Sequence, residues 1–151
     1  MNIRTAIVRR AIDVTALMAE ARDTGNGATL VFLGTVREVN DGRAVTGIEY
    51  SAYGEMAERE LAAIASECAA TFDVTHLVAE HRLGELALGD VSIAIVVAHP
   101  HRADAYDASR FVIEEVKRRL PVWKCEGYVD GTSEWVNAGG VAEEHSAEER
   151  Q

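Results

Sequence analysis

Residues 55–71 have the sequence EMAERELAAIASECAAT, and this stretch decides the fold class because its apolar side chains recur at helical spacing. Charged residues gather in its first turns, as expected of an amphipathic helix. Its predicted buried face consists of Ala57, Leu61, Ile64, Ala65, Cys68 and Phe72. The flanking stretches Val45–Tyr53 and Val74–Arg82 have the alternation and apolar content of strands. A helix between two strands predicts a domain that mixes both kinds of element.

The alternation within Val45–Tyr53 predicts a half-buried strand with Ile48 and Tyr50 on one face and Val45 on the other. The polar residues 37–43 before it predict a turn or mobile loop, tightest at Asp41-Gly42.

The N-terminal region adds two strands and a short helix. Ile3–Val8 is the first predicted strand, and the apolar run Ala28–Val36 predicts a central one. Between them, Asp13 is the expected cap of a helix from Val14 to about Ala21. The side of this helix predicted to face the protein carries Leu17, Met18 and Ala21.

The C-terminal half continues with a strand at Val91–His99, reached through the connection at 83–90, and a helix from about Asp104 to Leu120. Pro121 ends this helix because proline disfavours helical geometry in the residue before it. Its predicted buried residues are Tyr106, Phe111, Val112, Ile113, Val116 and Leu120. A short hairpin follows, with strands at 122–129 and 134–136 around Asp130-Gly131. The sequence therefore predicts one α+β domain over residues 1–137 and an acidic, flexible tail at 138–151.

Composition narrows the function. The formal net charge of −10 argues against general nucleic-acid binding, which needs a basic face. The longest strongly apolar run, Val91–Ala98, is too short to cross a membrane, and the N-terminus lacks a signal-peptide pattern, so we expect a cytoplasmic protein. Cys68 and Cys125 form neither a zinc-type pair nor a disulfide framework.

The segment Lys117-Arg-Arg-Leu-Pro-Val-Trp-Lys124 places four of the chain's 15 basic residues together. The break at Pro121 could bring both lysines to one pocket, where they would bind an anion and where a lowered lysine pKa would provide a general acid or base. The alternative is that these cations complement the dipole of a helix C-terminus, which explains Lys124 poorly because it lies beyond the helix.

Two further segments are candidates for anion binding. His99-Pro-His101-Arg102 precedes a helix, where backbone N–H groups attract anions, although it also fits a simple cap with surface histidines or, less well, a metal site. Gly34-Thr-Val-Arg37 brings an arginine to the exit of an apolar strand. The glycines form no phosphate-loop or dinucleotide fingerprint. Cys125 has little support as a nucleophile, since no histidine and carboxamide stand around it in the sequence.

Several of these segments together resemble the large subunit of molybdopterin synthase, in that family's order and spacing from about residue 28 to 136. The matching pieces are Phe32-Leu-Gly-Thr-Val-Arg37, Ile48-Glu-Tyr-Ser-Ala-Tyr53 with Met56, His81-Arg-Leu-Gly84, His101-Arg102, and Lys117 with Leu120-Pro-Val-Trp-Lys124. The resemblance implies an α/β hammerhead-type fold with a mostly antiparallel sheet. It also implies a homodimer in which each subunit binds one small ubiquitin-like sulfur carrier, making a heterotetramer. The carrier ends in a Gly-Gly thiocarboxylate, and its sulfur is transferred to cyclic pyranopterin monophosphate to form the dithiolene of molybdopterin.

The resemblance also implies roles for single residues. Lys117 and Lys124 match the two active-site lysines, with Lys117 nearest the carrier's terminal carbonyl and Lys124 holding the substrate. The expected substrate-binding residues are Thr35, Val36, Arg37, His101, Arg102, Lys117, Lys124, Cys125 and Glu126, with His101 and Arg102 contributed by the neighbouring subunit. No metal or other cofactor is expected. Two departures stand out: His99-Pro100 where the family has small residues, and Cys125 where a basic residue is common.

Two other functions remain open from the residues alone. One is a non-catalytic module that binds a small anion and a partner protein. The other is a metal-dependent hydrolase using His99 and His101.

Overall fold

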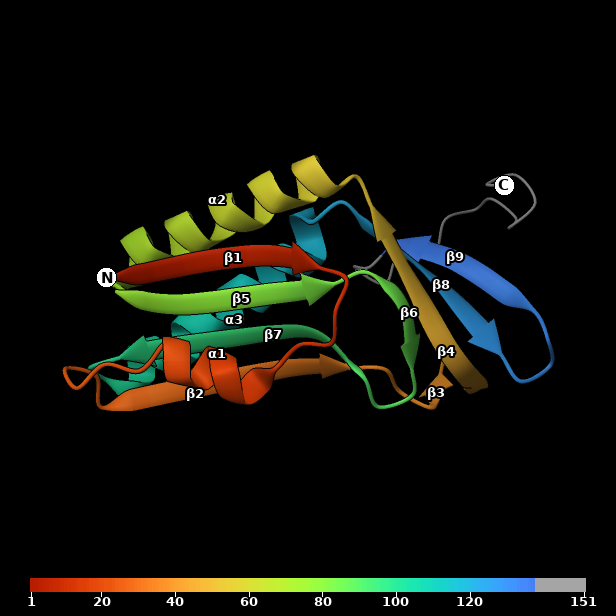
Figure 1. Cartoon of the computed structure of the whole chain (residues 1–151), viewed down its shortest axis with the longest axis horizontal. Coiled ribbons are helices and arrows are strands. Elements are labelled where there is room, and N and C mark those ends of the chain that lie inside the picture. Colours follow the sequence, from red (N-terminus) through yellow and green to blue (C-terminus); the bar gives the residue numbers. More distant parts are fainter. Residues whose placement is uncertain (138–151) are drawn as a thin grey trace.

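The computed structural model describes residues 1–137, which form two sheets set end to end with three helices packed on the first (Figure 1). The first sheet has the order β1-β5-β7-β2, with only β1 and β5 parallel. Its strands are β1 (Asn2–Val8), β2 (Ala28–Thr35), β5 (His76–Arg82) and β7 (Val91–His99). Helices α2 (Gly54–Phe72) and α3 (Arg102–Arg119) cover one face and α1 (Val14–Glu20) the other.

The second sheet stands beyond one end of the first, and β4 is its central strand. Its strands are β3 (Val39–Asn40), β4 (Arg43–Ala52), β6 (Gly84–Ala87), β8 (Val122–Tyr128) and β9 (Ser133–Asn137). The chain passes from β5 into β6 at Gly84, whose φ of 101° is a conformation that residues with a side chain rarely adopt. The predicted α+β domain with mostly antiparallel pairing is confirmed.

The helices form and end for the reasons that the sequence indicates. The Asp13 side chain accepts a hydrogen bond from the Ala16 backbone N–H at the start of α1. Helix α2 buries Ala57, Leu61, Ile64, Ala65 and Cys68, all predicted from residues 55–71, and packs against β1, β5 and α3. It ends at Asp73, which has a left-handed backbone conformation. Helix α3 ends before Pro121, as expected. This last boundary fixes where Lys117 and Lys124 lie relative to each other.

Four strand predictions need correction. Ala28–Val36 is not central: β2 is an edge strand of the first sheet. The predicted loop at 37–43 contains β3, which pairs with β4 across the Asp41-Gly42 turn, and the connection at 83–90 contains β6. Val45 lies buried with Ile48 and Tyr50 instead of opposite them, because the pairing of β4 with β8 shifts register between Val45 and Gly47.

Two predicted core residues are exposed. Met18 of α1 is 45% exposed and Tyr106 of α3 is 63% exposed. Each borders the predicted apolar stripe of its helix. The predicted acidic tail at 138–151 lies outside the described residues.

Candidate active site

A cavity of about 150 Å³ lies where the two sheets meet, at the C-terminal end of α3. Its apolar walls come from Phe32, Val45, Ile48, Ile93, Ile113, Val116 and Leu120. Its polar lining comes from Thr35, Arg37, Asn40, Tyr50, His81, Ser92, Lys117, Lys124 and Glu126. We call this the junction cavity. The predicted convergence of Arg37, Lys117 and Lys124 is therefore present in the fold.

Lys117 reaches the junction cavity from the last turn of α3. Its side chain keeps contact with solvent, but protein atoms around the ammonium group remove enough water to lower its pKa. The positive charges of Lys124 and Arg37 lower this pKa further. A lysine in this environment exchanges a proton more readily near neutral pH than an isolated surface lysine does.

Lys124 and Glu126 are two residues apart on β8, so their side chains point to the same face of the strand and both line the cavity. The two side chains form an ion pair, with 3.1 Å between Lys124 Nζ and Glu126 Oε1. Glu126 also accepts hydrogen bonds from Asn40 Nδ2, at 2.9 and 2.8 Å, and from the Tyr128 hydroxyl at 3.0 Å. Burial alone would raise the pKa of Glu126, but these hydrogen bonds outweigh it and the pKa is lowered. Glu126 is thus an ionised anchor that holds the Lys124 ammonium in place.

Arg37 is connected to the same group of side chains. Its Nη2 donates to Asn40 Oδ1 at 3.1 Å, and Asn40 in turn donates to Glu126. Asn40 is held in β3, the short strand that the sequence did not predict. Through Asn40, the arginine at the exit of β2 is oriented by the carboxylate that orients Lys124.

His81 forms part of the cavity wall, and its side chain is almost fully buried. Its Nδ1 lies 3.0 Å from the Arg82 carbonyl oxygen, and its ring meets Tyr50 edge-on at 5.2 Å between centroids. Burial lowers the pKa of His81 to about 4, and the charge of Lys117 contributes in the same direction. The segment His81–Gly84 is part of the family resemblance, but sequence reasoning gave this histidine no role, and it missed Asn40 and Tyr50 as well.

Four predicted site residues lie outside the junction cavity. Val36 is buried, and its backbone N–H and carbonyl bond to Asp90 and Gly89. Cys125 faces away from Lys124 and lies beside Glu49 and Gly127 on the other side of β8. The exposed His101 and Arg102 start α3, about 22 Å along the helix from Lys117 at 1.5 Å per residue. Substrate contacts from these four residues stay predictions.

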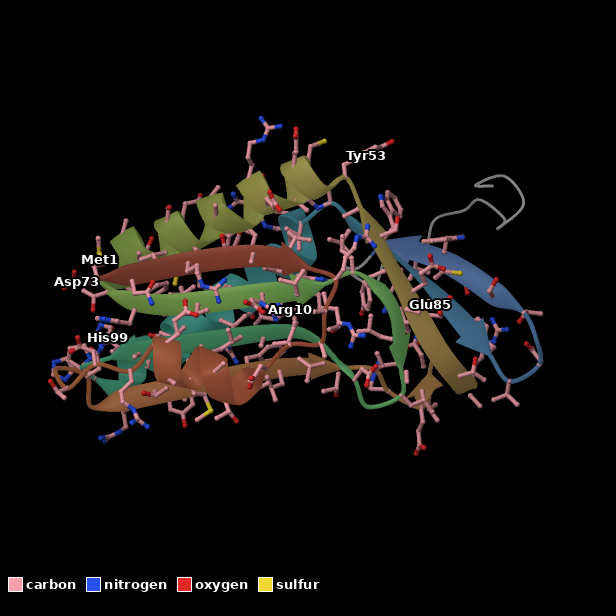
Figure 2. All side chains as sticks on the ribbon, in the orientation of Figure 1. Met1, Arg10, Tyr53, Asp73, Glu85 and His99 are labelled. Carbon is pink, nitrogen blue, oxygen red and sulfur yellow. The ribbon has the colours of Figure 1, made fainter. Side chains whose placement is uncertain are left out.

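The His99 side chain bonds to the protein backbone, including the backbone of His101. His99 lies at the end of the first sheet remote from Glu85 and the second sheet (Figure 2). Its Nδ1 accepts from the His101 backbone N–H at 2.9 Å, so its Nε2, 3.0 Å from the Phe72 carbonyl oxygen, is the donor. Within residues 1–137, no group of three His, Cys, Asp or Glu side chains could hold a metal ion.

None of the helices in this part of the chain is long and apolar enough to span a membrane.

Comparison with known proteins gives the family. A sequence-family model described as "MoaE protein" matches residues 7–119. The chain belongs to the MoaE protein family. Curated proteins similar to this MoaE family member are called molybdopterin synthase catalytic subunit. The one from Halalkalibacterium halodurans is 38% identical over 133 residues, which is 88% of this chain and 85% of that protein.

The rice relative (Oryza sativa subsp. indica) is 42% identical over 120 residues, covering 80% of this chain but only 62% of its own length. Among solved structures, molybdopterin synthase from Staphylococcus aureus is similar with a TM-score of 0.81 and 37% identity, over 86% of this chain and 94% of that chain. A chain in the complex of subunits 1 and 2 of molybdopterin-converting factor from Helicobacter pylori is 21% identical with a TM-score of 0.71, a likeness of fold. The MoaE fold thus extends over most of the chain.

Proposed function

We propose that this chain is the catalytic subunit of a molybdopterin synthase, a sulfurtransferase of molybdenum cofactor biosynthesis. It would transfer sulfur from the thiocarboxylated C-terminus of a small carrier subunit to cyclic pyranopterin monophosphate. The observation that carries this proposal is the convergence of Lys117, Lys124 and Arg37 on one cavity in a protein of net charge −10. The names of the relatives from Halalkalibacterium halodurans and rice support it.

The cavity chemistry suits a reaction whose nucleophile arrives from outside. Its lining contains cations and hydrogen-bonding groups but no cysteine. In the proposed reaction the carrier's thiocarboxylate sulfur forms a bond to a side-ring carbon of the pyranopterin as the C–O bond at that carbon breaks. The oxygen leaves as the opened phosphate for one of the two sulfurs and, after protonation, as water for the other. Water then cleaves the acyl–sulfur bond, so each carrier leaves as a carboxylate. Lys117, with its lowered pKa, moves the protons, while Lys124 and Arg37 hold the cyclic phosphate.

The homodimer expected from the family resemblance also has a physical basis in the edge strand β2. Two copies that pair their β2 strands antiparallel would continue the sheet across a two-fold axis. Such pairing would place the Ala28 end of one copy beside the Thr35 end of the other. His101 of the neighbouring copy would come with it, because Gly27 packs against the Pro100 backbone. Arg102 and His101 of that copy would then lie near Arg37 and complete the site.

The experiment is to mix the purified chain with thiocarboxylated carrier and cyclic pyranopterin monophosphate and to quantify dithiolene product. We expect turnover by the wild type and loss of turnover in Lys117→Ala. Size-exclusion chromatography should show that Lys117→Ala still forms the complex with the carrier. Arg118→Ala is the matched control, because Arg118 is exposed on the same helical turn and pairs with Glu115. Near-normal turnover in Lys117→Ala would contradict the role given to Lys117. Binding of both partners without product would favour the non-catalytic module instead.

A further inference from the structure

His81 is a buried, titratable side chain in the junction cavity to which the proposed mechanism gives no task. It lies on β5 with its ring in the cavity wall, and it is only 4% exposed. The Arg82 carbonyl holds one side of the ring, and Tyr50 contacts it edge-on. The orientation of this imidazole is therefore fixed before any ligand arrives.

The hydrogen bond to Arg82 decides the tautomer of the ring. A carbonyl oxygen only accepts, so the proton of this bond must lie on Nδ1 of His81. Burial, together with the charge of Lys117, lowers the pKa of His81 to about 4, so the ring is neutral at physiological pH. Nε2 then carries a lone pair and acts as a hydrogen-bond acceptor.

The other polar groups of the cavity make such an acceptor unusual. Arg37, Lys117 and Lys124 can only donate. The Glu126 oxygens already accept from Asn40, Lys124 and Tyr128, and Asn40 Oδ1 accepts from Arg37. The Ser92 hydroxyl donates to the Gly34 carbonyl. The hydroxyls of Thr35 and Tyr50 can rotate to donate or accept, but the imidazole nitrogen of this tautomer can only accept.

We propose that His81 Nε2 is a substrate-contacting hydrogen-bond acceptor, which selects a ligand that carries an N–H or O–H donor beside its anionic group. The inference rests on the proposed function and deepens it: Lys124 and Arg37 bind the phosphate, and His81 binds the heterocycle. A pterin ring system supplies N–H donors, and the apolar walls around Ile48 and Ile93 suit its flat faces. A simple anion would satisfy the cations and leave Nε2 unused.

The test compares two ligands across two variants by isothermal titration calorimetry. His81→Phe keeps a ring against Tyr50 but removes the acceptor, whereas His81→Gln retains an oxygen that can accept. The ligands are cyclic pyranopterin monophosphate and sulfate, an anion that carries no hydrogen-bond donor. We expect His81→Phe to bind the pterin roughly three- to tenfold more weakly, the loss of one hydrogen bond, with unchanged sulfate affinity. His81→Gln should bind the pterin more tightly than His81→Phe does.

Each other result overturns the inference. Unchanged pterin affinity in His81→Phe would show that Nε2 does not contact the substrate. An equal weakening of sulfate would show that the cavity itself has collapsed and that the role is structural, and equal pterin losses in both variants would show that the lone pair does not matter. If the wild type fails to bind the pterin, the proposed function fails and this inference with it. If the wild type binds and turns over the pterin but His81→Phe does so equally well, only this inference fails.

Discussion

Lys117 and Lys124 stand on either side of Pro121, and different neighbours decide what each ammonium group can do. Burial lowers the pKa of Lys117, and the nearby cations Lys124 and Arg37 lower it further, which favours proton exchange. The Lys124 ammonium pairs with the carboxylate of Glu126, which fixes its position for binding an anion. The division of labour that the family resemblance implies therefore agrees with the electrostatics of the cavity.

The depressed pKa of His81 makes a prediction about stability. Its folded-state pKa of about 4 lies below the ordinary value of 6.5, so the unfolded chain binds the proton more tightly. The contribution of the neutral, buried His81 to the unfolding free energy is complete above pH 6.5 and is lost as the pH falls toward 4. Between pH 7 and pH 5 we expect the wild type to lose about 2 kcal/mol of unfolding free energy through this residue.

The measurement is urea denaturation of the wild type and of His81→Phe at both pH values. The unfolding free energy of the wild type minus that of His81→Phe should fall by that amount between pH 7 and pH 5. The phenyl ring of the variant cannot titrate, and the other ionisable groups are common to both proteins. A difference that stays constant with pH would mean that His81 binds its proton equally tightly in the folded and the unfolded chain, and the argument for a neutral buried ring would fail too.

At the scale of elements, β2 is the part of the fold that its own sequence describes least well. Its apolar run resembles a buried central strand, yet β2 is an edge strand with Val31 36% and Leu33 40% exposed. An apolar edge strand is an unfavourable feature in a monomer because its unpaired backbone groups and apolar side chains attract another chain. The apolar character of β2 agrees with pairing to a second copy.

This pairing predicts the effect of Leu33→Glu. A glutamate on each copy would bring two charges to the shared sheet face and oppose pairing, so we expect dimerisation to weaken at least about tenfold while each chain stays folded. Light scattering during size-exclusion chromatography at several protein concentrations would measure the dissociation. Met18→Glu is the control, because Met18 has similar exposure but lies on α1. A Leu33→Glu protein that remains as dimeric as the Met18→Glu control would rule out the β2 interface.

At the scale of the whole molecule, the prediction concerns the dimer, because the proposed site contains Lys117 of one chain and Arg102 of the other. Lys117→Ala and Arg102→Ala should each be inactive as homodimers. In a mixed dimer, one site contains both substitutions and the other contains neither. Random reassociation of equal amounts should therefore restore about a quarter of the wild-type activity, because about half of the dimers are mixed and half of their sites are intact.

To test this prediction, the two variants are unfolded, mixed and refolded together, and each variant is also refolded alone. The turnover of the mixture is then compared with that of each variant. Recovery of activity would require the two residues to act across the interface. If the mixture stays inactive while each single variant retains a folded dimer, the two residues do not share a site across the interface.

Local patterns sufficed for most of the fold. Helix α2 follows from the spacing of Ala57, Leu61 and Ile64, the start of α1 from Asp13, and the end of α3 from Pro121, because these effects act within a few residues of the chain. The strands β3 and β6 could not be predicted in this way. Each is short, and each exists because β4 offers a partner whose pairing the local pattern does not reveal.

The sequence by itself determined the α+β class, and the family resemblance in it marked Lys117, Lys124 and Arg37, because residue type and spacing carry that information. Only the tertiary structure decided what stands around them. It places Asn40 and Glu126 beside Lys124, turns Cys125 away from the cavity, and buries His81 against Tyr50. Burial, pKa and hydrogen-bond partners depend on atoms that are distant along the chain and close in space, so a pattern of neighbours in the sequence does not contain them.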